Sequence, residues 1–148
     1  MSGIQGRMPT QGKGRDDLLV LLEEAQSKSG YLSADLIAEL TQSLAMSLSD
    51  VYGVATFYSF LSTKPQGKNI IRICQSLPCY LKNSRLIIKS IGDELGIKPG
   101  ETTPDGKFSF GLANCIGACD EAPAMLINND VHGNLTPKKI SKILKEYK

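Results

Sequence analysis

The chain has 148 residues, of which 41% are hydrophobic and 22% are charged, and it contains no Trp. This length is typical of one domain, or of a small domain with an accessory bundle, and the composition excludes a collagen-like or wholly disordered chain. Seventeen basic and fifteen acidic side chains leave a formal charge of +2. That balance excludes a global field that would attract nucleic acid or an anionic membrane surface.

The N-terminal part predicts a tail followed by a helical bundle. Residues 1–15 are rich in Gly and poor in apolar side chains, which favours a flexible tail. Over residues 16–64 the apolar side chains recur at helical spacing and predict three helices. The first begins near Asp16 and ends at Gly30, the second has Ser33 as its N-cap and the third has Ser49. The aromatic side chains of the third helix suit the core of the bundle and a partner-docking face equally well: Tyr52, Phe57 and Tyr58.

Residues 68–148 predict an α/β domain. A β-branched run at 69–74 predicts a buried strand, and a helix follows it, capped by Asn83 or Ser84 and ended by Gly96. The apolar face of this helix is predicted to consist of Leu86, Ile87, Ile91 and Leu95. Residues 107–112 predict a second strand, 124–127 and 131–135 a hairpin, and a last helix begins at Thr136. The order predicts an α+β chain, in which an N-terminal helical bundle precedes an α/β domain that resembles an abbreviated thioredoxin-like layer.

The four cysteines fall in two close pairs, Cys74 with Cys79 and Cys115 with Cys119. Each pair comes where a predicted strand gives way to a loop, and loops held by a rigid sheet are where ligating groups can converge. The N-terminus lacks the apolar segment of a secretory signal, and no apolar run approaches the ~20 residues that span a membrane. We therefore expect a cytoplasmic chain with no membrane span, in which paired thiols are more often metal ligands or catalytic groups than disulfides.

Two kinds of centre take four thiolates. A [2Fe–2S] cluster takes two for each iron, and two separate loops can hold it from two sides. A structural Zn²⁺ also takes four, but usually from C-x2-C pairs, whereas the pairs here are C-x4-C and C-x3-C. The spacing favours iron and sulfur, with a zinc-stabilised interaction module as the alternative. The C-x-x-C redox motif is absent, and His132, interpreted as a turn or surface residue, is the only histidine, which excludes Rieske ligation within one chain.

The chain contains neither the G-x-G-x-x-G motif nor the phosphate-binding G-x-x-x-x-G-K-[ST] motif. An iron–sulfur centre alone moves single electrons and performs no bond chemistry on an organic substrate. An electron-carrying subunit is therefore favoured over a self-sufficient enzyme.

Several short motifs are recognisable together. They are GYLS at 30–33, VYGVATFY at 51–58, PQGK at 65–68, the C-x4-C loop, DGKF at 105–108, CIGACDEAP at 115–123 and GNLTP at 133–137. This set closely resembles the small [2Fe–2S] subunit of NADH dehydrogenases, the type found in respiratory complex I, which belongs to the thioredoxin-like [2Fe–2S] ferredoxin family. Similar subunits occur in NAD-linked and electron-bifurcating hydrogenases and in formate dehydrogenases.

The resemblance implies one [2Fe–2S] cluster in a thioredoxin-like domain at 68–148, with four ligands: Cys74, Cys79, Cys115 and Cys119. It also implies a larger FMN- and NAD(H)-binding iron–sulfur subunit as partner, with further iron–sulfur, hydrogenase or dehydrogenase subunits. Electrons would pass between that flavin and this cluster, and a stand-alone ferredoxin that shuttles between partners is the alternative. The first cysteine loop, Gln75-Ser-Leu-Pro78, departs from the Gly/Thr-type residues common in the family, and Asn114 stands where an acidic residue is frequent. Both departures bear on the potential of the cluster.

Overall fold

The computed structural model describes residues 14–147, which form two compact units divided between Pro65 and Gln66. Most of the predicted tail, residues 1–13, lies outside the described residues. Arg15 already belongs to a short 3₁₀ turn, η1 (Arg15–Asp17). In the described part of the chain, no helix is both long enough and apolar enough to cross a membrane.

The first unit contains three helices, α1 (Leu18–Ser29), α2 (Ala34–Leu44) and α3 (Leu48–Phe57). Gly30 ends α1 in the left-handed region at φ 81°, and the Ser33 hydroxyl accepts a hydrogen bond from the Leu36 N–H at the start of α2, as predicted. The prediction of Ser49 as the N-cap of α3 is wrong. Ser47 takes that place, because its hydroxyl accepts from the Asp50 N–H.

The core of this unit consists of buried aliphatic side chains from all three helices: Leu18, Leu21, Leu22, Ala25, Leu32, Ile37, Leu40, Leu44, Val51 and Ala55. The aromatic residues of α3 are outside it. Core packing, one of the two interpretations left open for the stretch at residues 51–58, holds for Val51 and Ala55. It is wrong for the aromatic side chains, since Tyr52 is 49% exposed and Phe57 is 79% exposed.

The second unit is built on a five-stranded sheet with the order β2-β3-β1-β4-β5. Its strands are β1 (Asn69–Cys74), β2 (Glu101–Thr102), β3 (Phe108–Ala113), β4 (Met125–Ile127) and β5 (Asp130–His132). β1 and β3 pair in parallel, and every other neighbouring pair is antiparallel. The predicted hairpin forms between β4 and β5, although its second strand ends at His132 and not at Leu135.

Three helices accompany this sheet: α4 (Leu77–Leu81), α5 (Ser84–Leu95) and α6 (Pro137–Glu146). Thr136 caps α6 as predicted, because its hydroxyl accepts from the Lys139 N–H. The prediction of Leu86 as a core residue of α5 is wrong, since its side chain is 52% exposed. The described residues thus contain six α-helices and a mixed sheet, which confirms the predicted α+β class.

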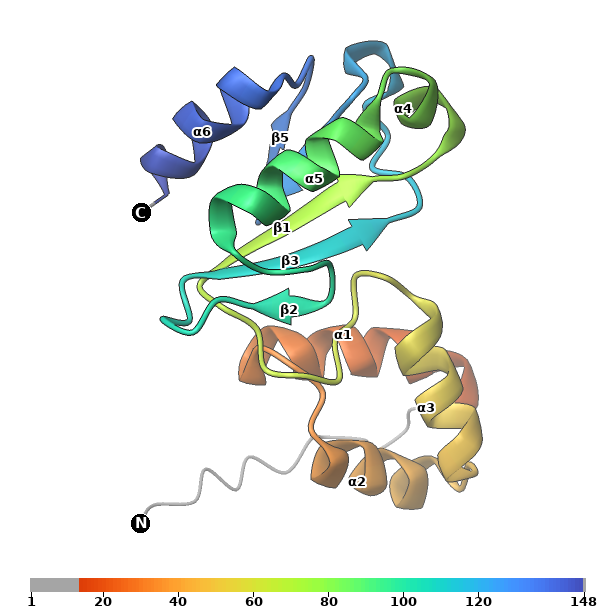
Figure 1. Ribbon diagram of the computed structural model, residues 1–148. Helices are drawn as coiled ribbons and strands as arrows, with labels where there is room; N and C mark the ends of the chain where they lie inside the picture. The colour runs from red at the N-terminus through yellow and green to blue at the C-terminus, as the bar shows by residue number, and fades with distance from the viewer. Residues whose placement is uncertain (1–13, 148) are drawn as a thin grey trace. The chain divides into compact units, whose positions relative to one another are not determined.

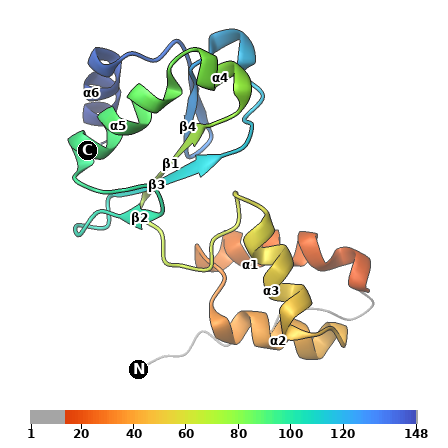
Figure 2. The ribbon, with the colours of Figure 1, turned by 45° about the vertical axis from the view of Figure 1, so that its right-hand side comes forward.

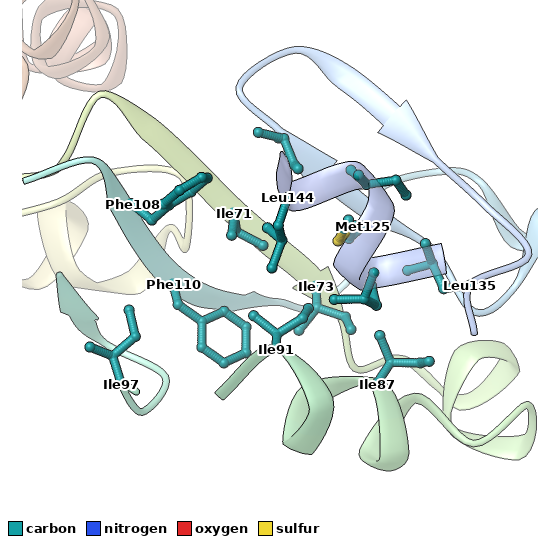
Figure 3. Close-up of a cluster of buried hydrophobic side chains, with 13 residues drawn as sticks. Ile71, Ile73, Ile87, Ile91, Ile97, Phe108, Phe110, Met125, Leu135 and Leu144 are labelled. Carbon is teal, nitrogen blue, oxygen red and sulfur yellow. The ribbon is translucent and has the colours of Figure 1, made fainter. Parts of the chain in front are cut away.

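α5 and α6 cover the same face of the sheet (Figure 1). Alternate residues of β1 and β3, such as Ile71, Ile73 and Phe110, point into the space that side chains of the two helices fill (Figure 3). The whole buried cluster consists of Ile71, Ile73, Ile87, Ile91, Ile97, Phe108, Phe110, Met125, Ile127, Leu135, Ile140, Ile143 and Leu144. The core therefore fixes the two central strands from which the cysteine segments leave.

Candidate metal centre

The four cysteines follow the C-terminal ends of β1 and β3. Cys74 is the last residue of β1, Cys79 lies in α4, Cys115 comes two residues after β3, and Cys119 begins the 3₁₀ turn η2 (Cys119–Glu121). Because β1 and β3 are parallel, their C-terminal ends meet at one edge of the sheet. α4 and η2 accordingly lie side by side beyond the ends of these strands (Figures 1 and 2).

Cys79 lies in a short helix, so the expectation that both pairs sit in loops is wrong for this residue. Ser76 occupies the N-cap position of α4 with extended backbone, and Pro78 fits the first turn, where a missing N–H costs no hydrogen bond. The helix has only five residues, and Cys79 is its one buried side chain. α4 therefore serves mainly to carry the second thiol inward.

The two cysteine pairs differ in exposure. Cys74 and Cys79 are buried, at 2% and 1% exposure, whereas Cys115 and Cys119 are exposed. All four are free thiols. The site thus has a buried pair on the β1 side and an exposed pair on the β3 side.

Hydrogen bonds link the sulfur atoms to backbone groups. The Gly117 N–H donates to the Cys115 Sγ at 3.4 Å, and the Cys74 thiol donates to the carbonyl oxygen of Asn114 at 3.7 Å. Gly117 has φ +79°, and a Cβ built on it would meet no atom within 4 Å. Backbone conformation, and not a lack of space, therefore favours glycine here.

The pKa values of the thiols show how closely the cysteines interact. Burial raises the pKa of Cys74, but hydrogen bonds from Ser76 and the Cys79 thiol outweigh burial and bring the pKa below its usual value. Burial raises the pKa of Cys79 to about 11, and the neighbouring Cys74 adds to the rise. Loss of water around its sulfur, followed by repulsion from Cys115, raises the pKa of Cys119. The cysteines therefore interact as two pairs, and Cys119 also influences Cys79 across the pairs.

The four thiols form two hydrogen-bonded pairs, Cys74 with Cys79 and Cys115 with Cys119. A [2Fe–2S] cluster takes two thiolates on each iron, so the donor set and its pairing match that cluster.

Three further contacts join the two cysteine segments to each other and to Ala124, the residue before β4. The Gln75 N–H donates to the Ala113 carbonyl at 2.9 Å, and the Cys74 N–H donates to the Ala124 carbonyl at 3.2 Å. The Gln75 side-chain amide donates to Oδ1 of Asn114 at 3.1 Å. The two segments are therefore tied together by main-chain and side-chain bonds.

His132 is half-buried at the end of β5, so it is a strand residue and not a turn residue. Its Nε2 lies 3.1 Å from the Tyr147 hydroxyl, which in turn donates to Asp130 at 2.7 Å.

Asp120, directly after Cys119, is exposed, and its charge contributes to the raised pKa of that thiol.

Ser76 contacts the site through hydrogen bonds from both its backbone and its side chain to Cys74. This residue was not identified from the sequence. A serine followed by Leu-Pro is a helix N-cap signal, and that signal stands between the two cysteines. The backbone groups of Ile116 and Ala124 also contact Cys74 and Cys79. No side-chain pattern announces such contacts, because any residue type can supply them.

Comparison with known proteins gives consistent matches along the chain. The family model described as thioredoxin-like [2Fe–2S] ferredoxin matches residues 4–148. A subunit of the NADH-quinone oxidoreductase of Pseudomonas aeruginosa is 36% identical over 146 residues, which cover 99% of this chain and 88% of that protein. The NADP-reducing hydrogenase subunit HndA of Solidesulfovibrio fructosivorans is 36% identical over 130 residues, covering 88% of this chain and 76% of HndA.

Among solved structures, a chain of an NAD⁺-reducing [NiFe]-hydrogenase in its air-oxidized state superposes with a TM-score of 0.72 and 25% identity. The match covers 88% of this chain but only 22% of the hydrogenase chain.

Proposed function

Because the chain belongs to the thioredoxin-like [2Fe–2S] ferredoxin family, we propose that it is the electron-carrying subunit of an NAD(H)-dependent oxidoreductase complex. Its cofactor is one [2Fe–2S] cluster, the cofactor that gives the family its name. The observation that carries the proposal is the pairing of four free thiols at the joint edge of β1 and β3. The subunit works in the cytoplasm and performs no bond chemistry of its own.

The proposed ligands are Cys74, Cys79, Cys115 and Cys119, within a cluster domain at residues 68–148 that follows the bundle at 16–64. The cluster, when bound, supplies transfer of single electrons. The protein contributes position and environment: α4 carries Cys79 inward, and the Gly117 N–H donates to the sulfur of Cys115. Donors of this kind stabilise negative charge on the sulfurs and so raise the reduction potential.

The flavin- and NAD(H)-binding partner is supported by exposed apolar side chains beside the thiols. Leu77 and Leu81 of α4 are 68% and 70% exposed, and Tyr80 between them is 45% exposed. Exposed apolar side chains gathered around a functional group mark an interaction site more often than chance exposure does. This surface therefore fits the face at which electrons pass to or from the larger subunit.

The helical unit offers a second apolar surface for the same complex. A groove of about 940 Å³ is lined mainly by apolar side chains of α2, α3 and the flanking segments, including Ile37, Leu48 and Tyr52. Leu48 is 60% exposed. A larger subunit that covers this groove would bury side chains that are costly to leave in water.

The cluster is tested by anaerobic purification followed by iron, sulfide and zinc analysis. We expect about two iron and two acid-labile sulfide per chain, with a visible spectrum that dithionite bleaches. A colourless protein with one zinc and no sulfide would overturn the proposal. Serine substitution of each cysteine in turn tests the ligands, and full cluster content in any of the four variants would remove that residue from the set.

The partner is tested by co-purification with a candidate flavin- and NAD(H)-binding protein from the same cells. Leu81→Asp should lower recovery of the complex at least tenfold, because a carboxylate replaces an apolar contact in the interface. Val131→Asp is the matched control, since Val131 is 51% exposed on β5. Equal recovery of both variants would contradict this docking surface, and a chain that purifies alone and exchanges electrons with several carriers would favour the stand-alone ferredoxin.

A further inference from the structure

The hydrogen bonding between β1 and β3 continues one step beyond the sheet. The last register pair of β1 and β3 is Cys74 with Ala113. One residue after β1, the Gln75 N–H still donates to the Ala113 carbonyl. Beyond this point the two segments diverge, one into α4 and the other toward Cys115. There the side chains of Gln75 and Asn114 meet at 3.1 Å and form a bridge, the Gln75–Asn114 bridge.

This bridge is placed between one cysteine of each pair. Gln75 directly follows Cys74, and Asn114 directly precedes Cys115. The Asn114 carbonyl also accepts the thiol hydrogen bond of Cys74 at 3.7 Å. The two side chains therefore connect the cysteine segments through one bond, and the main-chain carbonyl of Asn114 also contacts the Cys74 sulfur.

We propose that the Gln75–Asn114 bridge is a positioning device that holds the two cysteine segments at the separation a [2Fe–2S] cluster requires. The inference rests on the proposed function. Neither residue is a ligand: each acts through the cysteine beside it. A bridge that holds the segments in place lowers the cost of ordering them, both while the cluster is built and while it is retained. The bridge is exposed, so its contribution to the free energy that holds the segments in place is that of one ordinary neutral hydrogen bond.

Four variants separate the bridge from the other properties of these side chains. Gln75→Leu and Asn114→Leu each remove the bridge, and the double variant removes both partners. Asn114→Asp keeps an acceptor for the Gln75 amide and adds a negative charge. Ser141→Ala is the matched control, because Ser141 donates an exposed side-chain bond of 2.8 Å to Glu94, between α6 and α5 of the same unit.

Two readouts are independent of electron transfer to a partner. The first is the rate at which visible absorbance is lost to an iron chelator, together with the rate of reconstitution from iron and sulfide. Both leucine variants should lose the cluster about fivefold faster than the unaltered chain, as expected for one neutral hydrogen bond. The double variant should lose it no faster than either single variant, since the second substitution finds the bridge already broken.

The second readout is the reduction potential, measured by an EPR-monitored titration. Asn114→Asp should retain the cluster as well as the unaltered chain and have a lower potential, because a negative charge beside the cluster disfavours an added electron. Rescue of retention by aspartate but not by leucine identifies the bridge, and not the asparagine itself, as the cause.

The result that overturns the inference is loss of the cluster from Gln75→Leu and Asn114→Leu at the rate seen for Ser141→Ala. Additive effects in the double variant would also overturn it, because they would mean that the two side chains act separately. Failure of the proposed function looks different: the unaltered chain would then take up no [2Fe–2S] cluster at all.

Discussion

Truncation of Ile73 tests whether the cluster depends on the core of its own unit and not on that of the helical bundle. Ile73 is 0% exposed on β1, next to Cys74, and its register partners are Leu112 and Met125. Ile73→Ala removes three buried carbons, worth about 2.4 kcal/mol at ~0.8 kcal/mol each, and the cavity raises the cost to about 3 kcal/mol. Leu40→Ala, at a 1% exposed position in α2, is the matched truncation in the other core.

The assay follows visible absorbance and far-UV circular dichroism during heating. In a domain of this size, about 3 kcal/mol lowers the midpoint by roughly 12–24 °C, so Ile73→Ala should bleach at a much lower temperature than the unaltered protein. Leu40→Ala should weaken the helical signal early and leave the bleaching midpoint in place. If both variants lowered the midpoint temperature of bleaching equally, the reasoning would be refuted, because the two units would then unfold as one.

Three other predictions use different parts of the structure. Cys115→Ser should lose or weaken the cluster and leave the helical bundle folded, and complete loss of the circular dichroism signal would contradict this. Tyr147 donates to Asp130, and this bond raises the pKa of the tyrosine to about 12 from its usual 10.0. The folded chain therefore keeps a proton that the unfolded chain releases, so the free energy of unfolding should fall between about pH 10 and pH 12. In Tyr147→Phe, urea unfolding measured across this pH range should show a smaller fall. A fall equal to that of the unaltered chain would contradict the prediction. In Gly133→Ala the new Cβ would collide with the Glu121 side chain and lie 2.9 Å from the Glu121 carbonyl oxygen. This overpacking should lower the free energy of unfolding by about 1–3 kcal/mol. A variant with unaltered stability would show that the contact relaxes.

The elements that the sequence predicts well are those with a local chemical signal. Ser33, Thr136 and Gly30 end or begin helices through their own hydroxyls or backbone freedom, so their positions are visible without tertiary structure. The apolar run at 69–74 has no regular polar face, and β1 is indeed the central strand, paired on both sides.

The elements that could not be predicted depend on distant parts of the chain. β2 has two residues and exists because Glu101 and Thr102 pair with β3. α4 has five residues, too few for a periodic pattern. Leu86 falls on an apolar helical spacing but stays exposed, because α5 packs on the sheet through Ile87 and Ile91.

The candidate site shows the same division. The residue types and the spacing of the two pairs are local features, and they are enough to favour a [2Fe–2S] cluster over a zinc site. The inner and outer character of the pairs was not predictable, because the burial of Cys79 follows from the short helix that carries it. Nor was the Gln75–Asn114 bond predictable, since those residues are remote in sequence and meet only through the parallel pairing of β1 with β3.

The parallel pairing of β1 with β3 also orders events during synthesis of the protein. β1 is made first, yet both of its neighbours, β3 and β4, come later in the chain, so Cys74 and Cys79 leave the ribosome before any sheet exists to hold them. Cys115 and Cys119 follow only after the crossover through α5 and β2 has been translated. If the four cysteines are the ligands, the complete set exists only after Cys119 has been translated, so we expect insertion of the cluster to follow synthesis of the sheet.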